Sequence, residues 1–426
     1  MRTSWRAVIF GLLICVGGCS HAHGRGGDDP EVVIEWNEIL ERVVPAGGLA
    51  PPRHYAMLHI AMFDAINSIQ RAYRPYRSYV RASFGASPEL AAAQAARDVL
   101  AAQFPASEST FDTALRSRIA RTPSGQVRGS LQIGKAVAAA ILTWRANDGW
   151  SATPAPYVLP ELPGMYQPTP PAFAAPAFRQ FADTQPFALL TSTQYLPGAP
   201  PSITTERYAQ DFEEVKQVGA ATSTVRTPEQ TQLAQLFANV TSTTVHWALW
   251  NHVARDVVRA QRLSLIETAR AFALLNVAIH DGVQTSHTSK FVYGGWRPIT
   301  AVHRADDDLN PLTIGDPSWK PLLTTPPYPA HAGNMACVGS SAARMLGLIF
   351  ESDDVAFTAT WIGSPGQPNV SRKYASFMQL AHDQANSRIY GGIHFRYESV
   401  VSQEACPKVA EYVFANFMEP RRAHHR

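Results

Sequence analysis

The chain has 426 residues, enough for two or three domains of ordinary size or for one large helical domain. Apolar residues make up 46% and charged residues 17%, and the formal net charge is +3. This composition excludes a disordered protein, a coiled coil and a protein that binds nucleic acid through bulk charge. Four cysteines are too few for a disulfide scaffold or a four-thiolate zinc site in the mature chain. Proline is the unusual residue, with 32 copies in 426 residues.

The amino terminus has the layout of a targeting segment. Arg2 and Arg6 precede an apolar run over residues 7–18, which ends in two glycines directly before Cys19. This layout is typical of a secretory signal peptide, and the run is shorter than the ~20 residues that span a bilayer. The context of Cys19 resembles a bacterial lipoprotein cleavage box. We therefore expect a signal peptide over residues 1–18, lipid attachment at Cys19 and export to the periplasm or outer membrane, with plain cleavage nearby as the alternative.

The rest of the chain has helical patterns. Apolar residues recur every three or four positions over residues 55–70, which predicts an amphipathic helix. A serine or threonine followed by proline, at 87–88 and 227–228, indicates a capped helix start, and Ser264 with Glu267 has the spacing of a capping box. We find no convincing series of alternating strands. Helices are predicted over residues 55–70, 88–103, 132–145, from 228 onward, 265–279, 335–350 and 371–386.

Twelve of the 32 prolines lie between residues 151 and 205. An internal proline costs a helix ~3 kcal/mol, so this segment cannot be one continuous helix. It is also rich in aromatic residues, leucine and alanine, which argues against a solvated linker. We predict an extended strap over residues 151–205, between an amino-terminal helical half, residues 30–150, and a carboxy-terminal helical domain, residues 206–420. In an oxidising compartment Cys337 and Cys406 can pair, although two buried free thiols fit the sequence equally well.

Three stretches combine cations or histidine with glycine and proline at the ends of predicted elements. They span residues 290–298, 326–336 and 387–395. Glycine lets backbone amides approach an anion, arginine offers a planar fork of donors, and lysine adds a point charge. A neutral imidazole nitrogen can attack phosphorus or coordinate a metal oxyanion. A single such residue carries little weight, but together the stretches predict an oxyanion site.

The joint pattern resembles the vanadium-dependent haloperoxidase and type-2 phosphatidic acid phosphatase superfamily. The signature of that superfamily is Lys-x6-Arg-Pro, then Pro-Ser-Gly-His, then Ser-Arg-x5-His. Lys290, Arg297 and Pro298 match the first motif in full, and residues 387–394 match the third in full. The resemblance extends over roughly residues 30–420 and is greatest to the soluble bacterial haloperoxidase branch. It implies an all-α fold of two helical bundles with the oxyanion site in the carboxy-terminal one.

The resemblance also implies roles for the matching residues. Lys290, Arg297 and Arg388 would neutralise the equatorial oxygens of vanadate, or of phosphate in the same site, and Lys290 would polarise peroxide. His394 would be the axial ligand of vanadium, or the nucleophile of a phosphatase. The partners would be hydrogen peroxide and a halide or small organic substrate, without nucleic acid, and the membrane would be met only through the lipid at Cys19. The oligomeric state stays open.

The second motif departs from the family. Aligned on the residues that follow it, the Pro-Ser-Gly-His tetrad becomes residues 332–335, with Met335 in the histidine position. A thioether cannot act as an acid or base at neutral pH. The amide of Gly333 and the side chain of Asn334 remain as candidate oxyanion donors. His331, which we favour as a loop histidine, would reach the site only through a rearranged turn, and Asp281 is a candidate for orienting a site arginine.

Three hypotheses follow from these residues. The leading one is a vanadate-dependent, peroxide-using haloperoxidase-like enzyme. The second is a soluble phosphatase that works through a phosphohistidine at His394. The third is a non-catalytic oxyanion-binding relative, suggested by Met335. The sequence does not separate vanadate from phosphate, because the same residues bind both.

Overall fold

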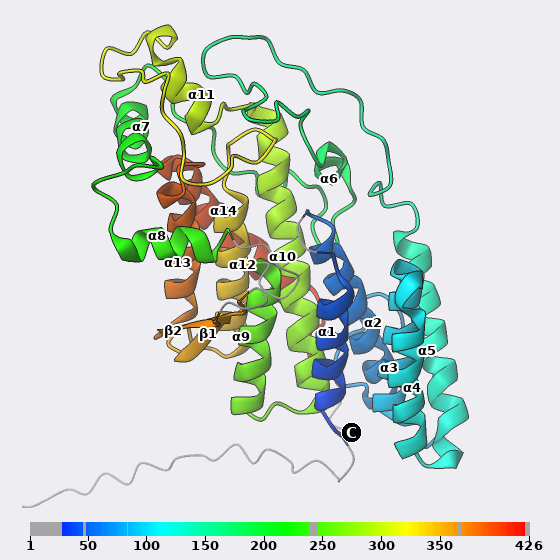
Figure 1. The fold of residues 1–426 in the computed structure, drawn as a ribbon. Coiled ribbons are helices and arrows are strands. Elements are labelled where there is room, and N and C mark those ends of the chain that lie inside the picture. Colours follow the sequence, from blue (N-terminus) through cyan, green and yellow to red (C-terminus); the bar gives the residue numbers. More distant parts are fainter. Residues whose placement is uncertain (1–27, 46–47, 83, 239–245, 364–367, 422–426) are drawn as a thin grey trace, which may run out of the picture.

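The computed structural model describes residues 28–45, 48–82, 84–238, 246–363 and 368–421 (Figure 1). The predicted signal peptide and Cys19 lie outside these residues. Within them the fold is helical apart from one two-stranded hairpin, which confirms the predicted all-α class. No helix among the described residues is both long and apolar enough to cross a membrane. The helices of four or more residues are α1 (Glu31–Val43), α2 (Pro51–Gln70), α3 (Pro88–Gln103), α4 (Glu108–Arg121), α5 (Ser124–Arg145), α6 (Arg179–Asp183), α7 (Glu206–Val218), α8 (Pro228–Leu236), α9 (His246–Ala260), α10 (Leu265–Tyr293), α11 (Pro298–His303), α12 (Asn334–Ile349), α13 (Phe377–Tyr390) and α14 (Arg396–Asn416).

The predicted helix starts are confirmed by their caps. The side chain of Ser87 accepts a hydrogen bond from the amide of Leu90 at 3.2 Å and begins α3. Thr227 forms a capping box at the start of α8. Ser264 does the same for α10, which continues to Tyr293, well beyond the predicted end at residue 279. These starts were predictable because each depends on hydrogen bonds within one turn.

The prediction of a helix over residues 371–386 is wrong at its beginning. Residues Val370–Tyr374 form strand β2, which pairs antiparallel with β1, Phe357–Trp361, while α13 begins only at Phe377 and continues to Tyr390. Tyr374 and Trp361 turn their buried side chains toward the helical body, as the two-residue period of a strand allows. Strand β2 forms because β1 supplies its backbone hydrogen bonds. The pattern of residues 371–386 could not predict this, since β1 lies outside that segment.

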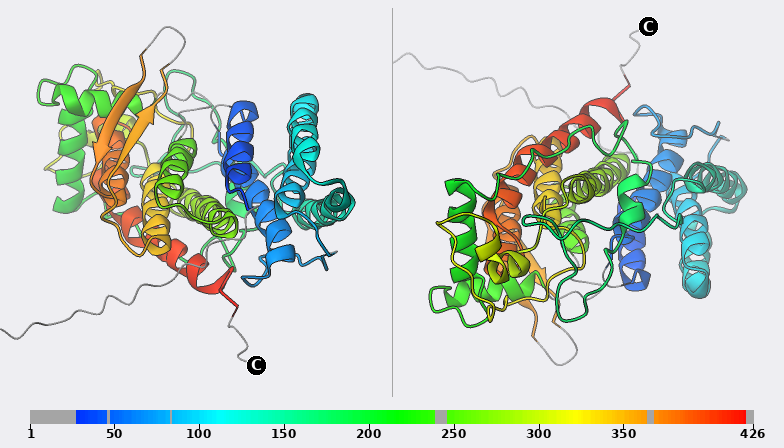
Figure 2. Two further views of the ribbon diagram at one scale, coloured as in Figure 1. Left: turned by 90° about the horizontal axis from the view of Figure 1, so that it is seen from below. Right: turned by 90° about the horizontal axis from the view of Figure 1, so that it is seen from above.

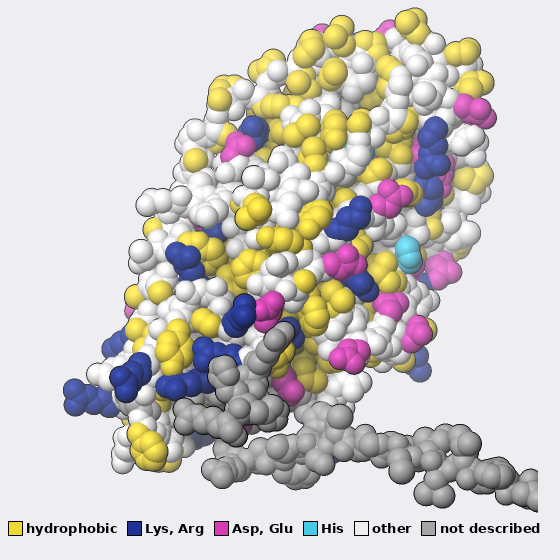
Figure 3. Space-filling view, turned by 180° about the vertical axis from the view of Figure 1, so that it is seen from behind, with side chains coloured by type: hydrophobic (Ala, Val, Ile, Leu, Met, Phe, Trp, Pro, Cys, Tyr) yellow, Lys and Arg dark blue, Asp and Glu magenta, His cyan; other side chains and the backbone are white. Residues whose placement is uncertain are grey.

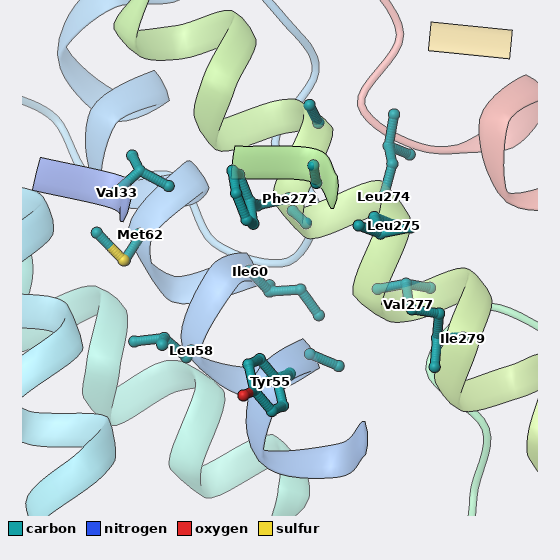
Figure 4. Close-up of a cluster of buried hydrophobic side chains, with 14 of the residues drawn as sticks. Val33, Tyr55, Leu58, Ile60, Met62, Phe272, Leu274, Leu275, Val277 and Ile279 are labelled. Atoms are coloured by element: carbon teal, nitrogen blue, oxygen red, sulfur yellow. The ribbon is translucent and has the colours of Figure 1, made fainter. Parts of the chain in front are cut away.

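Helix α10 lies between the amino-terminal helices and the carboxy-terminal ones, as the end-on views show (Figure 2). It packs against both α2 and α12, and its residues are buried from Leu265 to Lys290 with few exceptions. Side chains of α2 and α10 meet in one buried cluster, which also includes Val33 of α1 (Figure 4). This core takes residues from both predicted halves, and the division into domains stays a prediction. On the face shown in Figure 3, basic and acidic side chains lie interspersed, in keeping with the small net charge.

The strap, residues 151–205, contains only the short helix α6 and otherwise runs as irregular chain over one end of α10 (Figure 1). The amide of Tyr166 donates to the carbonyl of Gly294 at 2.7 Å, and the amide of Trp296 donates to Gly164 at 2.9 Å. Gly294 ends α10 in the left-handed conformation, with φ of 62°. The strap therefore fixes the backbone immediately before Arg297.

Cys337 and Cys406 form a disulfide, with 5.2 Å between their Cα atoms. The bond joins the first turn of α12 to the middle of α14, and both cysteines are fully buried. Of the two alternatives that the sequence left open, the structure has the pair. The disulfide ties together two helices whose amino-terminal ends meet at the site described next.

Candidate oxyanion site

A cavity of about 170 Å³ lies at the amino-terminal end of α12. Its wall combines two cationic or imidazole groups from the third sequence motif with aromatic and aliphatic side chains from four other segments. It is lined by Gly48, Leu49, Phe178, His246, Trp247, Pro326, Tyr328, Asn334, Met335, Arg388 and His394.

His394 lies between α13 and α14 and is 4% exposed. Its Nδ1 is 2.5 Å from Oε2 of Glu398, and its Nε2 is 3.2 Å from Nη1 of Arg297. Because a carboxylate only accepts and a guanidinium only donates, Nδ1 carries the hydrogen and Nε2 presents its lone pair. Burial, followed by the charges of Arg297 and Lys290, holds the pKa of His394 well below its usual range. His394 is therefore a neutral imidazole suited to coordinate or attack an electrophilic centre.

Glu398 orients His394 and was missed by the sequence analysis. Its Oε2 also accepts from the amide of Phe395 at 3.1 Å at the start of α14. Burial raises the pKa of Glu398 to about 7, while Lys290 and Arg297 oppose the rise. A signal for this residue was present, because an acid three residues into a helix and four after a histidine can cap the helix and reach the ring at once.

Arg297 is fully buried and directs its donors to several acceptors. Its Nε donates to the carbonyl of Tyr328 at 2.7 Å, and Nη1 donates to the carbonyl of Ile393 at 2.9 Å. Its Nη2 has no hydrogen-bond partner among the described residues. A buried charged donor without a partner is costly, so this atom indicates a place for an anionic acceptor.

Arg388, near the end of α13, lines the cavity, while Arg297 and Lys290 do not. Nη1 of Arg388 donates to the carbonyl of Phe237 at 3.1 Å. Burial lowers the pKa of Arg388 to about 10, which leaves it a cation at neutral pH. The ammonium of Lys290 instead donates to the carbonyls of Ala330, at 2.7 Å, and Ala332. The structure thus brings Arg388 and His394 to the cavity and Arg297 against His394, while Lys290 is bonded to the backbone of residues 330 and 332.

The two donors predicted from the second motif are largely engaged elsewhere. The amide of Gly333 donates to the carbonyl of Glu398 at 3.2 Å, so the prediction that it faces the oxyanion is wrong. The reason is the close packing of α12 against α14, which the spacing of the motif does not reveal. Asn334 lines the cavity, but its Oδ1 accepts from Ser286 at 2.8 Å and its Nδ2 lies 3.3 Å from Nδ1 of His287. One amide hydrogen of Asn334 is left for a ligand.

Met335 lines the cavity, as expected for the residue at the histidine position of the motif. His331 does not line it. The Nε2 of His331 donates to the carbonyl of Gly198 at 2.7 Å, and its ring packs against Tyr293 and Tyr397. This agrees with the interpretation of His331 as a loop histidine.

Asp281 does not orient a site arginine. Its carboxylate accepts from the amides of residues 187, 188 and 189 at 2.7–3.0 Å, and it also lies 2.9 Å from Nδ1 of His280. Asp281 therefore holds the strap against α10. The prediction failed because a carboxylate next to a cationic motif in sequence points to a different face of the helix.

Two further residues of the wall, His246 and Trp247, were not singled out in the sequence. They begin α9, and His246 is 7% exposed. The Nδ1 of His246 has no hydrogen-bond partner among the described residues. Burial, with the nearby charge of Arg388, lowers the pKa of His246 to about 3. No motif marks these residues, since α9 joins the site only through tertiary packing.

The donor set suits a tetrahedral oxyanion better than a metal cation. Arg388 lines the cavity beside the neutral imidazole of His394, and Arg297, 3.2 Å from that imidazole, has one guanidinium nitrogen without a partner among the described residues. Such a set matches the oxygens of vanadate or phosphate. Within the described residues there is no group of three or more histidine, cysteine or acidic side chains placed to hold a metal cation.

Comparisons with known proteins point to the vanadium haloperoxidases. Residues 270–422 match the family described as the VCPO second helical-bundle domain. Vanadium chloroperoxidase of Curvularia inaequalis is 26% identical over 191 residues, which cover 34% of this chain and 31% of that protein. The chain thus matches about a third of the length of this relative.

Solved structures share the fold over nearly the whole chain. One described as the first bacterial vanadium-dependent iodoperoxidase is 23% identical with a TM-score of 0.76, covering 92% of this chain and 97% of that one. A holo-type bacterial vanadium-dependent chloroperoxidase is 14% identical with a TM-score of 0.73, covering 91% and 97%. Residues 270–422 therefore match the family of the second helical-bundle domain, and the fold of the chain is that of the bacterial vanadium-dependent haloperoxidases.

Proposed function

We propose that the protein is a vanadate-dependent haloperoxidase that oxidises a halide with hydrogen peroxide. The observation that carries the proposal is the buried, unpartnered Nη2 of Arg297, on the guanidinium that lies 3.2 Å from the lone pair of His394. The match of residues 270–422, the curated relative and the shared fold support a haloperoxidase-like enzyme, and the finer activity is our inference.

Each site residue has a defined task in this proposal. His394 holds vanadium through Nε2, and Glu398 keeps the hydrogen on Nδ1 so that Nε2 stays free. Arg297 and Arg388 bind the vanadate oxygens. Lys290, held by the carbonyl of Ala330, adds to the positive electrostatic potential at the site. Vanadate supplies a Lewis acid that activates peroxide without a change of its own oxidation state. Fixed cations around the site stabilise charge that develops on oxygen.

A phosphatase is the second candidate function. The same donors fit phosphate, and the lone pair on Nε2 of His394 is placed to attack phosphorus. The third candidate, an oxyanion-binding protein without turnover, rests on Met335 in the cavity wall.

One experiment separates these candidates. The purified mature protein is loaded with orthovanadate and assayed for peroxide-dependent bromination and iodination, beside hydrolysis of an aryl phosphate. We expect halogenation that His394→Ala abolishes. Phosphate ester hydrolysis alone would favour the phosphatase, and vanadate binding without either activity would favour the binding protein. Absence of vanadate binding would overturn the proposal.

We further propose that the protein is exported and anchored by a lipid at Cys19. The support is the sequence layout of residues 1–19. The mass of the amino-terminal peptide from membrane-extracted protein tests this, since a lipidated Cys19 adds the mass of its acyl chains. An unmodified mature start would exclude the anchor.

A further inference from the structure

Halide oxidation requires that a proton be moved, and Met335 cannot move it. The balanced reaction is H2O2 + X− + H+ → HOX + H2O, in which the halide loses two electrons and peroxide gains them. One oxygen must lose a proton as peroxide binds, and the other must gain one as it leaves as water. A thioether neither binds nor releases a proton at neutral pH. Another group at the cavity must therefore carry this proton if turnover is fast.

Two imidazoles line the cavity among the described residues, His246 and His394. Both ring nitrogens of His394 are committed, Nδ1 to Glu398 and Nε2 to Arg297 and the oxyanion centre. His246 differs, because its Nδ1 has no partner in the described structure. Its ring stacks on Phe237, with 6.2 Å between centroids, and is buried in the wall.

We propose that His246 is the acid–base residue of this site, contributed by α9 in place of the histidine that the second motif lacks. Protonated while the oxyanion is bound, the ring gives its proton to the oxygen that leaves as water and then regains the proton that peroxide loses on binding. The other oxygen goes to the halide, and one proton from solvent completes HOX. This inference rests on the proposed haloperoxidase function, because that reaction is the one in which the proton is transferred.

The surroundings of His246 fit a base that becomes an acid only when an anion is bound. Phe237 of the segment after α8 and Trp247 of α9 are uncharged, and Arg388 of α13 is the charged neighbour that acts on the ring. With the cavity free of anion, burial and Arg388 hold the pKa at about 3, so the ring is neutral and can accept a proton. An oxyanion beside Arg388 offsets its charge and favours the protonated ring.

His331 is the competing imidazole, and its geometry is less suited to the task. Its Nδ1 also has no partner among the described residues, but the ring does not line the cavity. Turning the ring into the cavity would break the 2.7 Å hydrogen bond from its Nε2 to the carbonyl of Gly198. His246 needs no rearrangement to offer Nδ1.

Proton uptake on anion binding tests His246 without any turnover. Calorimetric titration with orthovanadate, in buffers of different ionisation enthalpy, gives the number of protons taken up per site. We expect His246→Gln to take up fewer protons than the natural protein, by a difference approaching one. Equal uptake in the two proteins would overturn the proposal. His246→Asn is a second variant without the imidazole. Thermal melting of both variants shows whether either substitution has unfolded the protein instead of only removing the base.

Kinetics provide the second test. His246→Gln should lower kcat by about 10²–10⁴-fold with little change in KM for peroxide or in vanadate affinity. Adding Met335→His to that variant should restore much of the loss, because the imidazole returns to the position of the family motif. If His331→Gln removes kcat and His246→Gln does not, the assignment is wrong. If the natural protein lacks peroxidase activity, the proposed function fails, and the calorimetric test still decides whether His246 takes up the proton.

Discussion

At the scale of single residues, the site contains more buried positive than negative charge, which favours the binding of an anion. Lys290, Arg297 and Arg388 converge near the cavity, with Glu398 as the buried carboxylate among them. Burying like charges together is unfavourable unless a counter-charge joins them. Burial is the largest cause that lowers the pKa values of all three cations, because it disfavours their charged forms. An oxyanion with two or three charges would relieve the cost.

Glu398→Gln tests how much the carboxylate contributes through His394. Glutamine keeps the size of the side chain and an oxygen acceptor but removes the charge that makes Nε2 more basic. We expect orthovanadate affinity to fall about 10–100-fold, the usual effect of losing a partner that orients a metal ligand. Calorimetric titration measures it. Glu214→Gln, which breaks a half-exposed ion pair with Arg396 near α14, is the matched control and should leave affinity unchanged. Unaltered binding by Glu398→Gln would show that the carboxylate only caps the helix.

At the scale of elements, the position of His394 depends on a close crossing of two chain segments. Gly392 has φ of 75°, a conformation that favours glycine, and its backbone crosses that of Gly219 at the end of α7. A Cβ at either glycine would run into the backbone of the other. The turn between α13 and α14 is thereby pressed against α7, two residues before His394.

Gly392→Ala should disturb both stability and the site. The added Cβ would clash with the carbonyl oxygen of Gly219 and with Pro321, in a backbone conformation that alanine rarely adopts. We expect a loss of about 1–3 kcal/mol in the free energy of unfolding, measured with urea, together with weaker orthovanadate binding. Gly125→Ala in α5 is the control, since a Cβ there meets nothing within 4 Å. If both variants behave alike, the crossing does not hold the turn in place.

At the scale of the whole molecule, buried histidines make stability depend on pH. Burial lowers the pKa of His59 and His246 to about 3 and of His54 and His331 to about 4. In the unfolded chain these histidines have the ordinary pKa of an exposed imidazole, about 6.5. Below that pH the unfolded state binds more protons than the folded state, so stability falls as the pH falls. Buried carboxyls act in the opposite sense, and two of them have large shifts.

Those carboxyls are Asp64, whose pKa burial raises to about 6, and Glu398, at about 7. Their folded forms hold protons more tightly, so they add stability as the pH falls. Four histidines outweigh two carboxyls, and we expect a net loss on the order of 2 kcal/mol between pH 6 and pH 5. Urea unfolding at the two pH values measures it. His59→Gln should make the decline smaller, and a stability that rises toward pH 5 would contradict the assignment.

The sequence by itself determined the features that depend on neighbours along the chain. The caps of α3, α8 and α10, the irregular strap and the spacing of Lys290, Arg297 and His394 were all predictable. A cap closes within one turn, proline acts on its own backbone, and a motif is a fixed interval. For the same reason the resemblance to the superfamily could be recognised from the intact first and third motifs, although the second motif is altered.

Only the tertiary structure decided which groups face the cavity. In it Lys290 donates to the carbonyl of Ala330, and the amide of Gly333 donates to the carbonyl of Glu398. His246 of α9 lines the cavity, and β1 pairs with β2. Each of these depends on helices or strands that are distant in sequence and meet through the packing of buried side chains. Residue spacing along the chain does not specify that packing. The hydrophobic effect favours burial of apolar surface but is non-directional, so it does not determine which elements contact each other.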